Sequence, residues 1–257
     1  MLWPPRDGEI TDEDLERLYD YPAGLDRPWV QVNFVSSVDG AVSVAGRSAG
    51  LGNEADRAVF MLGRDLCDVV LVGAGTALVE GYQGIKAGEV RASRRARLGL
   101  APVPPIAVVT GRCSIEPTSA LLTAATVPPI ILTTRAAPRE RRDALAAAGA
   151  DVVVAGEQTV ALDLALAALR ERGLLRVDCE GGPKVFGALI DADLVDVLCV
   201  TFSPLLAGGD AGRISNGPLP PSPRSMELAS VLHHDSALLL RYRKVTPDPV
   251  TWSTSPR

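Results

Sequence analysis

Histidine is almost missing from this chain of 257 residues, which carries only the adjacent pair His233 and His234. Such a pair, at a predicted hairpin turn, offers little to a histidine-based metal site or to a Ser-His-Asp triad. Cysteine is scarce as well, and its four positions show no C-x-x-C spacing: Cys67, Cys113, Cys179 and Cys199. We therefore expect reduced, mostly buried thiols and no bound metal.

Long apolar runs are also lacking. The longest, such as residues 69–72 and 237–240, fall far short of the about 20 residues that cross a bilayer. The N-terminal residues do not resemble a signal peptide, so we expect a cytoplasmic protein without a membrane partner. Neither sign of charge dominates, because 26 Lys and Arg face 31 Asp and Glu, a net charge of −5. This balance gives no electrostatic reason to expect nucleic acid as a partner.

The composition itself is globular, with 47% hydrophobic and 22% charged residues. Continuous apolar runs alternate with helical segments, a pattern typical of a parallel sheet covered by helices on both faces. Strands are predicted at 29–35, 68–73, 106–110, 130–133, 151–154, 175–180 and 194–202, and helices at 138–148, 159–172 and 183–190. Another helix is expected to run through Arg64 from an N-cap at Asn53, with Glu54 and Asp56 in its first turn, where the helix dipole favours acids.

The two ends of the chain differ from this middle. Residues 1–28 are polar and predict a short helix packed on the main domain, whereas 226–232 and 237–245 predict a terminal antiparallel hairpin. No repeat or linker divides the remainder. The expected architecture is therefore an N-terminal extension, 1–28, and one α/β domain, 29–257, with a mixed, mainly parallel sheet and helices on its faces. The arginines of 91–97 predict a basic, exposed face.

The segment 175–186 is the most informative stretch. A strand ends at Glu180, two glycines follow, and Pro183 suits the first position of the next helix. Glycines permit close approach, and bare N–H groups at a helix start bind anions, so this turn suits a pyrophosphate. An ordinary strand-to-helix turn explains the same residues about equally well.

Three further strand ends offer weaker signals. Gly73-Ala74-Gly75-Thr76 lacks the third glycine of a Rossmann fingerprint but offers backbone donors and the Thr76 hydroxyl. Ser36-Ser37-Val38-Asp39-Gly40 predicts a hairpin turn, and the functional alternative is that this turn lies at the edge of a cleft and contacts the nicotinamide end of a cofactor. Thr110-Gly111-Arg112 closes another strand, where the planar arginine suits a ribose 2′-phosphate, or else is a solvated surface residue.

Taken together, these segments resemble the pyrimidine reductase of riboflavin biosynthesis, usually the C-terminal half of a bifunctional deaminase-reductase. The resemblance runs from about Trp29 to the end and is carried by 35–40, 73–76, 180–183, 192–196 (Ala-Asp-Leu-Val-Asp) and 203–209 (Ser-Pro-Leu-Leu-Ala-Gly-Gly). The H-x-E and P-C-x-x-C signatures of a zinc deaminase do not occur, so a stand-alone reductase is expected.

The resemblance implies a dihydrofolate-reductase-like fold, NADPH as hydride donor and a homodimer. It implies the reaction of 5-amino-6-(5-phosphoribosylamino)uracil reductase, in which a ribosylamino sugar is opened and reduced to ribitylamino. Substrate contacts are expected from Ser48, Arg64 and Glu180, and the catalytic candidates are Asp39 and Glu180. The residues expected to bind the cofactor are Val35, Ser36, Gly75, Thr76, Glu80, Thr110, Arg112, Gly181, Gly182, Pro183, Lys184, Val185 and Phe186.

The sequence departs from the family pattern mainly on the substrate side. Glu80 stands where an aspartate is usual, Gly50 replaces a frequent tryptophan, and the arginine that binds the substrate phosphate is absent, with Lys86 nearby. Two alternatives therefore stay open. The same fold and cofactor site can serve dihydrofolate, which has no ribose phosphate, or the chain can be an NADP-binding module without turnover.

Overall fold

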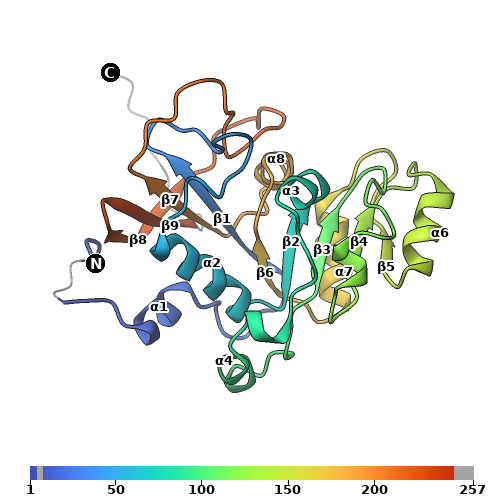
Figure 1. Ribbon diagram of the computed structural model, residues 1–257, viewed down its shortest axis with the longest axis horizontal. Helices are drawn as coiled ribbons and strands as arrows, with labels where there is room; N and C mark the ends of the chain where they lie inside the picture. Colours follow the sequence, from blue (N-terminus) through green and yellow to red (C-terminus); the bar gives the residue numbers. More distant parts are fainter. Residues whose placement is uncertain (5–7, 246–257) are drawn as a thin grey trace, which may run out of the picture.

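A single mixed sheet forms the centre of the molecule. The computed structural model describes residues 1–4 and 8–245, and within them nine strands follow the order β5-β4-β3-β2-β6-β1-β7-β9-β8 (Figure 1). The strands are β1 (Trp29–Ser37), β2 (Val69–Gly73), β3 (Ile106–Val109), β4 (Ile130–Thr133), β5 (Asp151–Val154), β6 (Arg176–Cys179), β7 (Val197–Ser203), β8 (Met226–His234) and β9 (Ala237–Lys244). Along this order, every neighbouring pair from β5 to β7 is parallel, and β9 pairs with β7 in the antiparallel sense. The expected mainly parallel sheet with a terminal antiparallel hairpin is confirmed.

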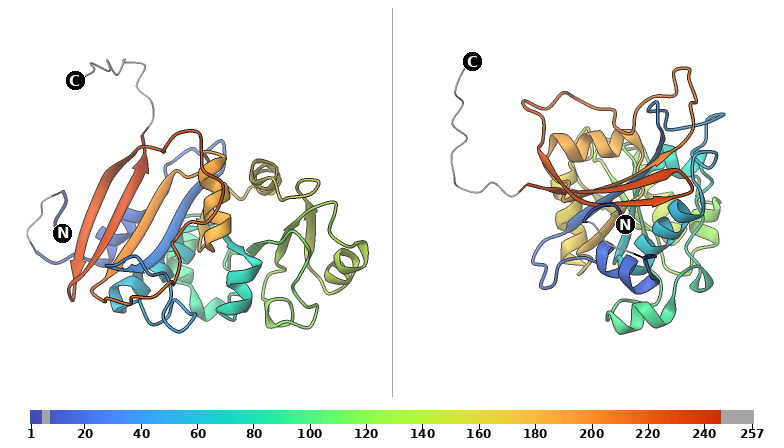
Figure 2. Two further views of the ribbon diagram at one scale, coloured as in Figure 1. Left: turned by 90° about the horizontal axis from the view of Figure 1, so that it is seen from above. Right: turned by 90° about the vertical axis from the view of Figure 1, so that its left-hand side faces the viewer.

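Helices cover both faces of this sheet. They are α1 (Asp12–Tyr19), α2 (Glu54–Leu66), α3 (Ala74–Val79), α4 (Ala92–Arg97), α5 (Ala120–Thr123), α6 (Arg139–Ala147), α7 (Leu162–Glu171) and α8 (Pro183–Asp191), with a 3-10 turn at Ala87–Glu89. The α2 side and the α7–α8 side enclose two separate apolar clusters. Figure 2 shows the β8–β9 hairpin at one end of the molecule and β4, β5 and α6 at the opposite end.

The alternation of side chains along β2 explains why a continuous apolar run was needed. Val70 and Val72 pack on the α2 side, whereas Val69 and Leu71 pack on the side of α7 and α8. Because successive residues of a strand point to opposite faces, a strand buried on both faces must be apolar throughout. The carboxyl ends of β1, β2 and β6 meet at one edge, where ligands bind in open α/β sheets.

The N-terminal segment packs on the domain through α1. Thr11 caps the helix by accepting a hydrogen bond from the Asp14 backbone, and Tyr19 is buried in the core beneath. The proposed C-terminal limit at residue 257 lies outside the described residues. Within the described residues, α1 contacts α2.

The prediction of an exposed basic face at 91–97 is wrong for two of its arginines. Arg94 is buried in α4 and forms ion pairs with Glu16 and Asp65. Arg95 is completely buried, and its guanidinium donates to backbone carbonyls at the end of α2, among them that of Cys67 at 2.9 Å. Those carbonyls have no helical partner, so the cation satisfies the helix end.

Candidate active site

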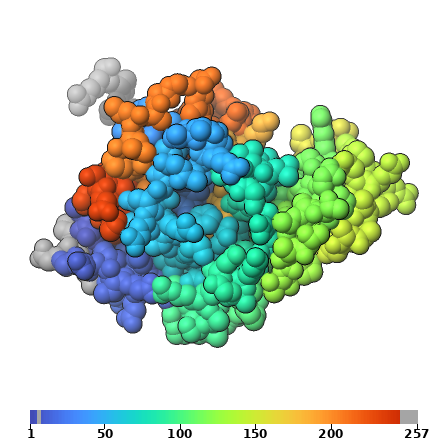
Figure 3. All heavy atoms as spheres, viewed as in Figure 1, coloured from blue at the N-terminus to red at the C-terminus, as the bar shows by residue number. Residues whose placement is uncertain are grey.

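A cavity of about 980 Å³ lies where β1, β2 and β6 end, beside the first turns of α2. Figure 3 shows the surface hollowed on this side, between the light-blue segment that leads into α2 and the teal segment around α3. Eight of the sequence-predicted site residues line it: Val35, Ser48, Arg64, Thr76, Glu80, Glu180, Gly182 and Pro183. The structure thus brings predicted cofactor and substrate residues to one cavity.

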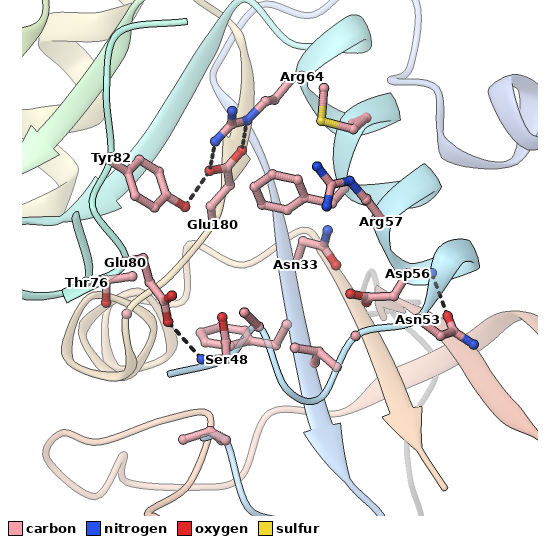
Figure 4. A pocket seen from close by; sticks show the side chains of 18 of the residues that line it. Asn33, Ser48, Asn53, Asp56, Arg57, Arg64, Thr76, Glu80, Tyr82 and Glu180 are labelled. Carbon is pink, nitrogen blue, oxygen red and sulfur yellow. Dashed lines mark hydrogen bonds and ion pairs between the residues drawn. The ribbon is translucent and has the colours of Figure 1, made fainter. Parts of the chain in front are cut away.

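Glu180 is the buried anchor of the cavity. Arg64 donates to it twice, from Nε to Oε1 at 2.6 Å and from Nη2 to Oε2 at 2.8 Å, and the Tyr82 hydroxyl donates to Oε2 at 2.6 Å (Figure 4). The Glu180 side chain is fully buried and that of Arg64 is 12% exposed. A bidentate pair in such surroundings is strong only because its geometry compensates for the desolvation of both charges.

The contacts with Glu180 shift the pKa values of Arg64 and Tyr82. Burial alone would lower the pKa of the Arg64 guanidinium, but the charge and hydrogen bonds of Glu180 raise it above its ordinary value. Burial and then the charge of Glu180 raise the pKa of the Tyr82 hydroxyl well above its usual range. Both side chains therefore keep their protons at neutral pH and hold the carboxylate in place.

Two glycine turns lie against each other at the floor of the cavity. The N–H of Gly73 donates to the carbonyl of Gly181 at 2.8 Å, which joins the ends of β2 and β6. A Cβ on Gly182 would lie 2.1 Å from Oγ1 of Thr76, and one on Gly181 would lie 3.0 Å from the Phe34 ring. Gly181 also has a φ of 98°, a region that side chains rarely adopt. The backbone of Gly181 therefore favours glycine, and a side chain on Gly182 would displace the Thr76 hydroxyl.

Helix α8 begins at this turn with its donors free of side-chain caps. Gly182 is the N-cap and Pro183 is the first helical residue. The exposed Lys184 adds a positive charge beside the helix start. Val185 and Phe186 are instead buried in the apolar cluster, where Phe186 stacks at 5.1 Å on Phe34. Val185 and Phe186, which were predicted to bind the cofactor, therefore pack in the core below the turn.

The loop between β1 and α2 closes another wall. The backbone N–H of Ser48 donates to Oε1 of Glu80 at 2.9 Å, so that Glu80 ties this loop to the end of α3. Gly75 is exposed at the start of α3, next to Thr76, which lines the cavity. Glu80 thus positions the Ser48 loop directly.

Besides Gly75, Gly181, Lys184, Val185 and Phe186, four further predicted residues do not line the cavity. Ser36 is buried at the end of β1, and Thr110 and Arg112 lie at the end of β3, where Arg112 is exposed. Asp39 is exposed and accepts hydrogen bonds from the side chain of Ser37 and, at 2.8 Å, from the backbone of Gly208. Asp39 therefore joins the turn after β1 to the loop after β7.

Sequence reasoning missed the part of the site that α2 supplies. Besides Arg64, the helix contributes Asp56, Arg57, Phe60 and Met61, and β1 adds Asn33. Figure 4 shows Asn33, Asp56 and Arg57 directed towards the same space. The helical spacing of residues 57, 60, 61 and 64 was the available signal, but polar residues on a helix usually indicate a solvated face. Tyr82 had no comparable pattern.

Within the described residues, no cluster of His, Cys, Asp and Glu is arranged to hold a metal ion. In the same part of the chain, no helix is both long and apolar enough to cross a membrane.

Comparison with known proteins identifies the family. The model of the RibD C-terminal domain matches residues 28–240. The chain belongs to this family. It is 32% identical over 196 residues to the 2,5-diamino-6-ribosylamino-4(3H)-pyrimidinone 5′-phosphate reductase of Archaeoglobus fulgidus, with 74% of this chain and 87% of the relative covered. The enzyme of the same name from Methanothermobacter thermautotrophicus is also 32% identical, over 74% of this chain and 85% of the relative. The RibD-family chain is therefore an oxidoreductase.

Solved structures agree on the fold. A pyrimidine reductase-like protein from Corynebacterium diphtheriae superposes with a TM-score of 0.73 at 24% identity, over 86% of this chain and 93% of that one. A Thermotoga maritima deaminase/5-amino-6-(5-phosphoribosylamino)uracil reductase gives 0.60 at 22% identity, over 85% of this chain and 57% of that one. The RibD reductase-domain fold is thereby shown, and the relatives give no support to a folate reductase.

Proposed function

We propose that the protein is an NADPH-dependent reductase that converts the ribosylamino group of a pyrimidine 5′-phosphate into a ribitylamino group. The observation that carries the proposal is a cavity that is lined both by the glycine turn of Gly182 and Pro183 and by the Arg64–Glu180 pair. The names of the archaeal relatives supply the substrate class.

The residues present fit a dinucleotide cofactor. The turn at Gly181 and Gly182 has no side chains, and the first turn of α8 has no capping side chain, so backbone N–H groups are available to a pyrophosphate. Lys184 contributes a positive charge at the same place. Arg112, exposed at the neighbouring strand end, is our candidate for the 2′-phosphate that distinguishes NADPH from NADH.

When bound, the cofactor supplies a hydride. The reaction needs the sugar ring of the ribosylamine to open to an imine, after which C1′ gains the hydride and the imine nitrogen gains a proton. The described residues position this imine: Val35 and Phe60 line the cavity with apolar surface, while Glu180 and Arg64 hold each other in fixed orientation. Such pre-organisation is the protein's main contribution in hydride transfer, and the proton can come from water.

The test is the oxidation of NADPH, followed by its absorbance, on addition of the phosphoribosylamino-pyrimidine. We expect equimolar consumption of NADPH and a product heavier by two hydrogen atoms. NADPH binding without turnover on either the diaminopyrimidinone or the uracil form of the substrate would support a binding module and contradict the proposal.

We further propose that the enzyme is a cytoplasmic homodimer. All four cysteines are free and buried, which suits a reducing compartment. Leu206 and Leu219 are 82% and 94% exposed on the loop after β7, an apolar surface that a second copy can cover. Light scattering should give twice the monomer mass, whereas a monomer would contradict this assembly.

A further inference from the structure

Asp56 places a carboxylate on the wall of the cavity. It lies in the first turn of α2, half-buried, and its side chain points into the cavity in Figure 4. Its backbone N–H donates to the side chain of Asn53 at 3.0 Å, which fixes the residue in the helix start. A Cβ on Gly52 would lie 2.6 Å from Oδ2 of Asp56, so the carboxylate is packed closely against this glycine.

The hydrogen-bonding capacity of this carboxylate is only partly used. The side chain of Thr201, buried in β7, donates one hydrogen bond to it. Among the described residues no Lys, Arg or His forms an ion pair with Asp56, although the adjacent Arg57 also lines the cavity. The buried carboxylates Glu180, Asp65 and Asp196, in contrast, each pair with an arginine.

An ionised carboxylate accepts several hydrogen bonds, and a half-buried one without a cation is costly unless donors reach it. Burial accordingly raises the pKa of Asp56, while the hydrogen bond from Thr201 opposes this shift. Because Asp56 lines the cavity, a ligand bound there can supply the missing donors. A flat ligand with two neighbouring N–H groups would satisfy both oxygens at once.

The compared proteins are named for two different pyrimidine rings, and only one of these rings has two neighbouring N–H groups of this kind. A 2-amino-4-oxopyrimidine presents the 2-amino group and N3–H side by side, on the edge remote from the sugar. A uracil has a carbonyl oxygen at position 2, and this oxygen would face the carboxylate with like partial charge. The archaeal relatives are named for the diaminopyrimidinone, and the Thermotoga protein for the uracil.

We propose that Asp56 determines the ring specificity of the enzyme: its carboxylate binds the 2-amino and N3–H groups of a 2-amino-4-oxopyrimidine and disfavours a uracil. This inference rests on the proposed function, since it names the ring within that substrate class. Asp56 acts here as a recognition residue and takes no part in proton transfer.

The test compares kcat/KM for the diaminopyrimidinone and uracil ribosylamino 5′-phosphates in the wild type and in Asp56→Asn. The amide keeps the size of the side chain, and its N–H₂ can donate to a uracil carbonyl. We expect the wild type to prefer the 2-amino ring, and the variant to shift the ratio towards uracil by about tenfold to a hundredfold, the size expected from hydrogen bonds to a charged group.

A matched control is Asp163→Asn. Asp163 is also in the first turn of a helix, α7, but it is exposed and lies outside the cavity lining. This change removes the same charge from a helix start and should leave the ratio unaltered. Thr201→Val provides a second variant, which removes one donor from Asp56 and should alter the same ratio by a smaller factor.

The outcomes separate the two proposals. If neither ring supports NADPH oxidation by the wild type, the proposed function fails. If at least one ring is reduced but the wild type prefers uracil, or Asp56→Asn leaves the ratio unchanged, the role of Asp56 is overturned while the reductase function stands.

Discussion

Arg64 and Glu180 depend on each other because both are withdrawn from water. Replacing Arg64 by Ala leaves the carboxylate of Glu180 buried with only Tyr82 as partner. Breaking a buried pair from one side costs about 3–5 kcal/mol of stability. We expect kcat/KM for the phosphorylated substrate to fall about a hundredfold or more, with little change in the Kd of NADPH.

The control for Arg64→Ala is Arg135→Ala, which removes an exposed arginine that pairs with Glu157 on the surface. Arg135→Ala should change neither kcat/KM for the phosphorylated substrate nor the Kd of NADPH. Equal losses of substrate and cofactor binding in Arg64→Ala would contradict the assignment of Arg64 to the substrate side.

Asp178 is a second buried carboxylate, and its oxygens have no hydrogen-bond partner within the described residues. Burial and then the charge of Glu180 raise the pKa of Asp178 well above its usual value. A raised folded pKa means that stability is greatest below the unfolded pKa, near 4, and is lost as pH rises towards the folded value.

Asp178→Asn removes the pH dependence of stability that the Asp178 carboxyl group causes. The variant should be more stable than the wild type at pH 8 by about 1–3 kcal/mol, and the difference should shrink towards pH 4. Denaturant unfolding at both pH values measures the difference. A gap that widens on acidification would show that Asp178 is ionised and stabilising in the fold.

Asp39, predicted as a catalytic candidate, is expected to brace two loops. The hydrogen bond from Ser37, and then those from Gly208 and Ala207, lower the pKa of Asp39 to about 2. A lowered pKa means that the brace is present above pH 4 and is lost as pH falls through about 2.

Asp39→Asn should therefore keep kcat within about tenfold of the wild type, since proton transfer by a side chain usually contributes 10²–10⁴-fold. Limited proteolysis should cut the loop after β7 faster in the variant. A loss of kcat of about a thousandfold with an unchanged loop would restore a catalytic role.

At the scale of elements, the sequence predicted the strands and the long helices well. Uniform apolar runs such as 69–72 are typical of strands that are buried on both faces, as β2 is. Short α4 was not predicted, since an arginine-rich segment has no apolar stripe and its order comes from Asp65, Glu16 and backbone carbonyls far along the chain.

The site residues could likewise be predicted only where a local sequence pattern marks them. Glycine turns and strand ends are local signals, so the Gly182 turn and Glu180 were recognisable from the sequence. Asp56 was predicted only as an acid favoured by the helix dipole. That its side chain faces the cavity depends on how α2 packs against β1 and β7, which no local pattern encodes.

The glycine turn itself yields a prediction at this scale. In Gly182→Ala the new Cβ would lie 2.1 Å from Thr76 Oγ1, so the Thr76 side chain or the turn must shift. We expect the Kd of NADPH to rise about tenfold or more, because misplacement of donors by even an ångström weakens their bonds. Fluorescence titration with NADPH measures it.

Gly88→Ala is the matched control, because a Cβ at Gly88 meets nothing within 4 Å. It should leave NADPH affinity unchanged. An unaltered affinity in Gly182→Ala itself would remove the pyrophosphate from this turn.

At the scale of the whole molecule, the sheet places two kinds of site residue on one cavity. The turns after β2 and β6 line it with Thr76, Gly182 and Pro183, while α2 and the loop before it line it with polar side chains such as Asp56 and Ser48. The cavity, at about 980 Å³, is at the upper end of the range usual for small-molecule sites, about 300–1,000 Å³. Its size suits a nicotinamide and a ribosylaminopyrimidine side by side.

The proposed reaction requires the cofactor and the sugar imine to meet in this cavity. The decisive measurement uses NADPH that carries deuterium at both positions of nicotinamide C4 and locates the label in the product by NMR. We predict one deuterium on C1′ of the ribityl chain. Product that forms without deuterium at C1′, or bound NADPH that is never oxidised, would contradict hydride transfer to the imine.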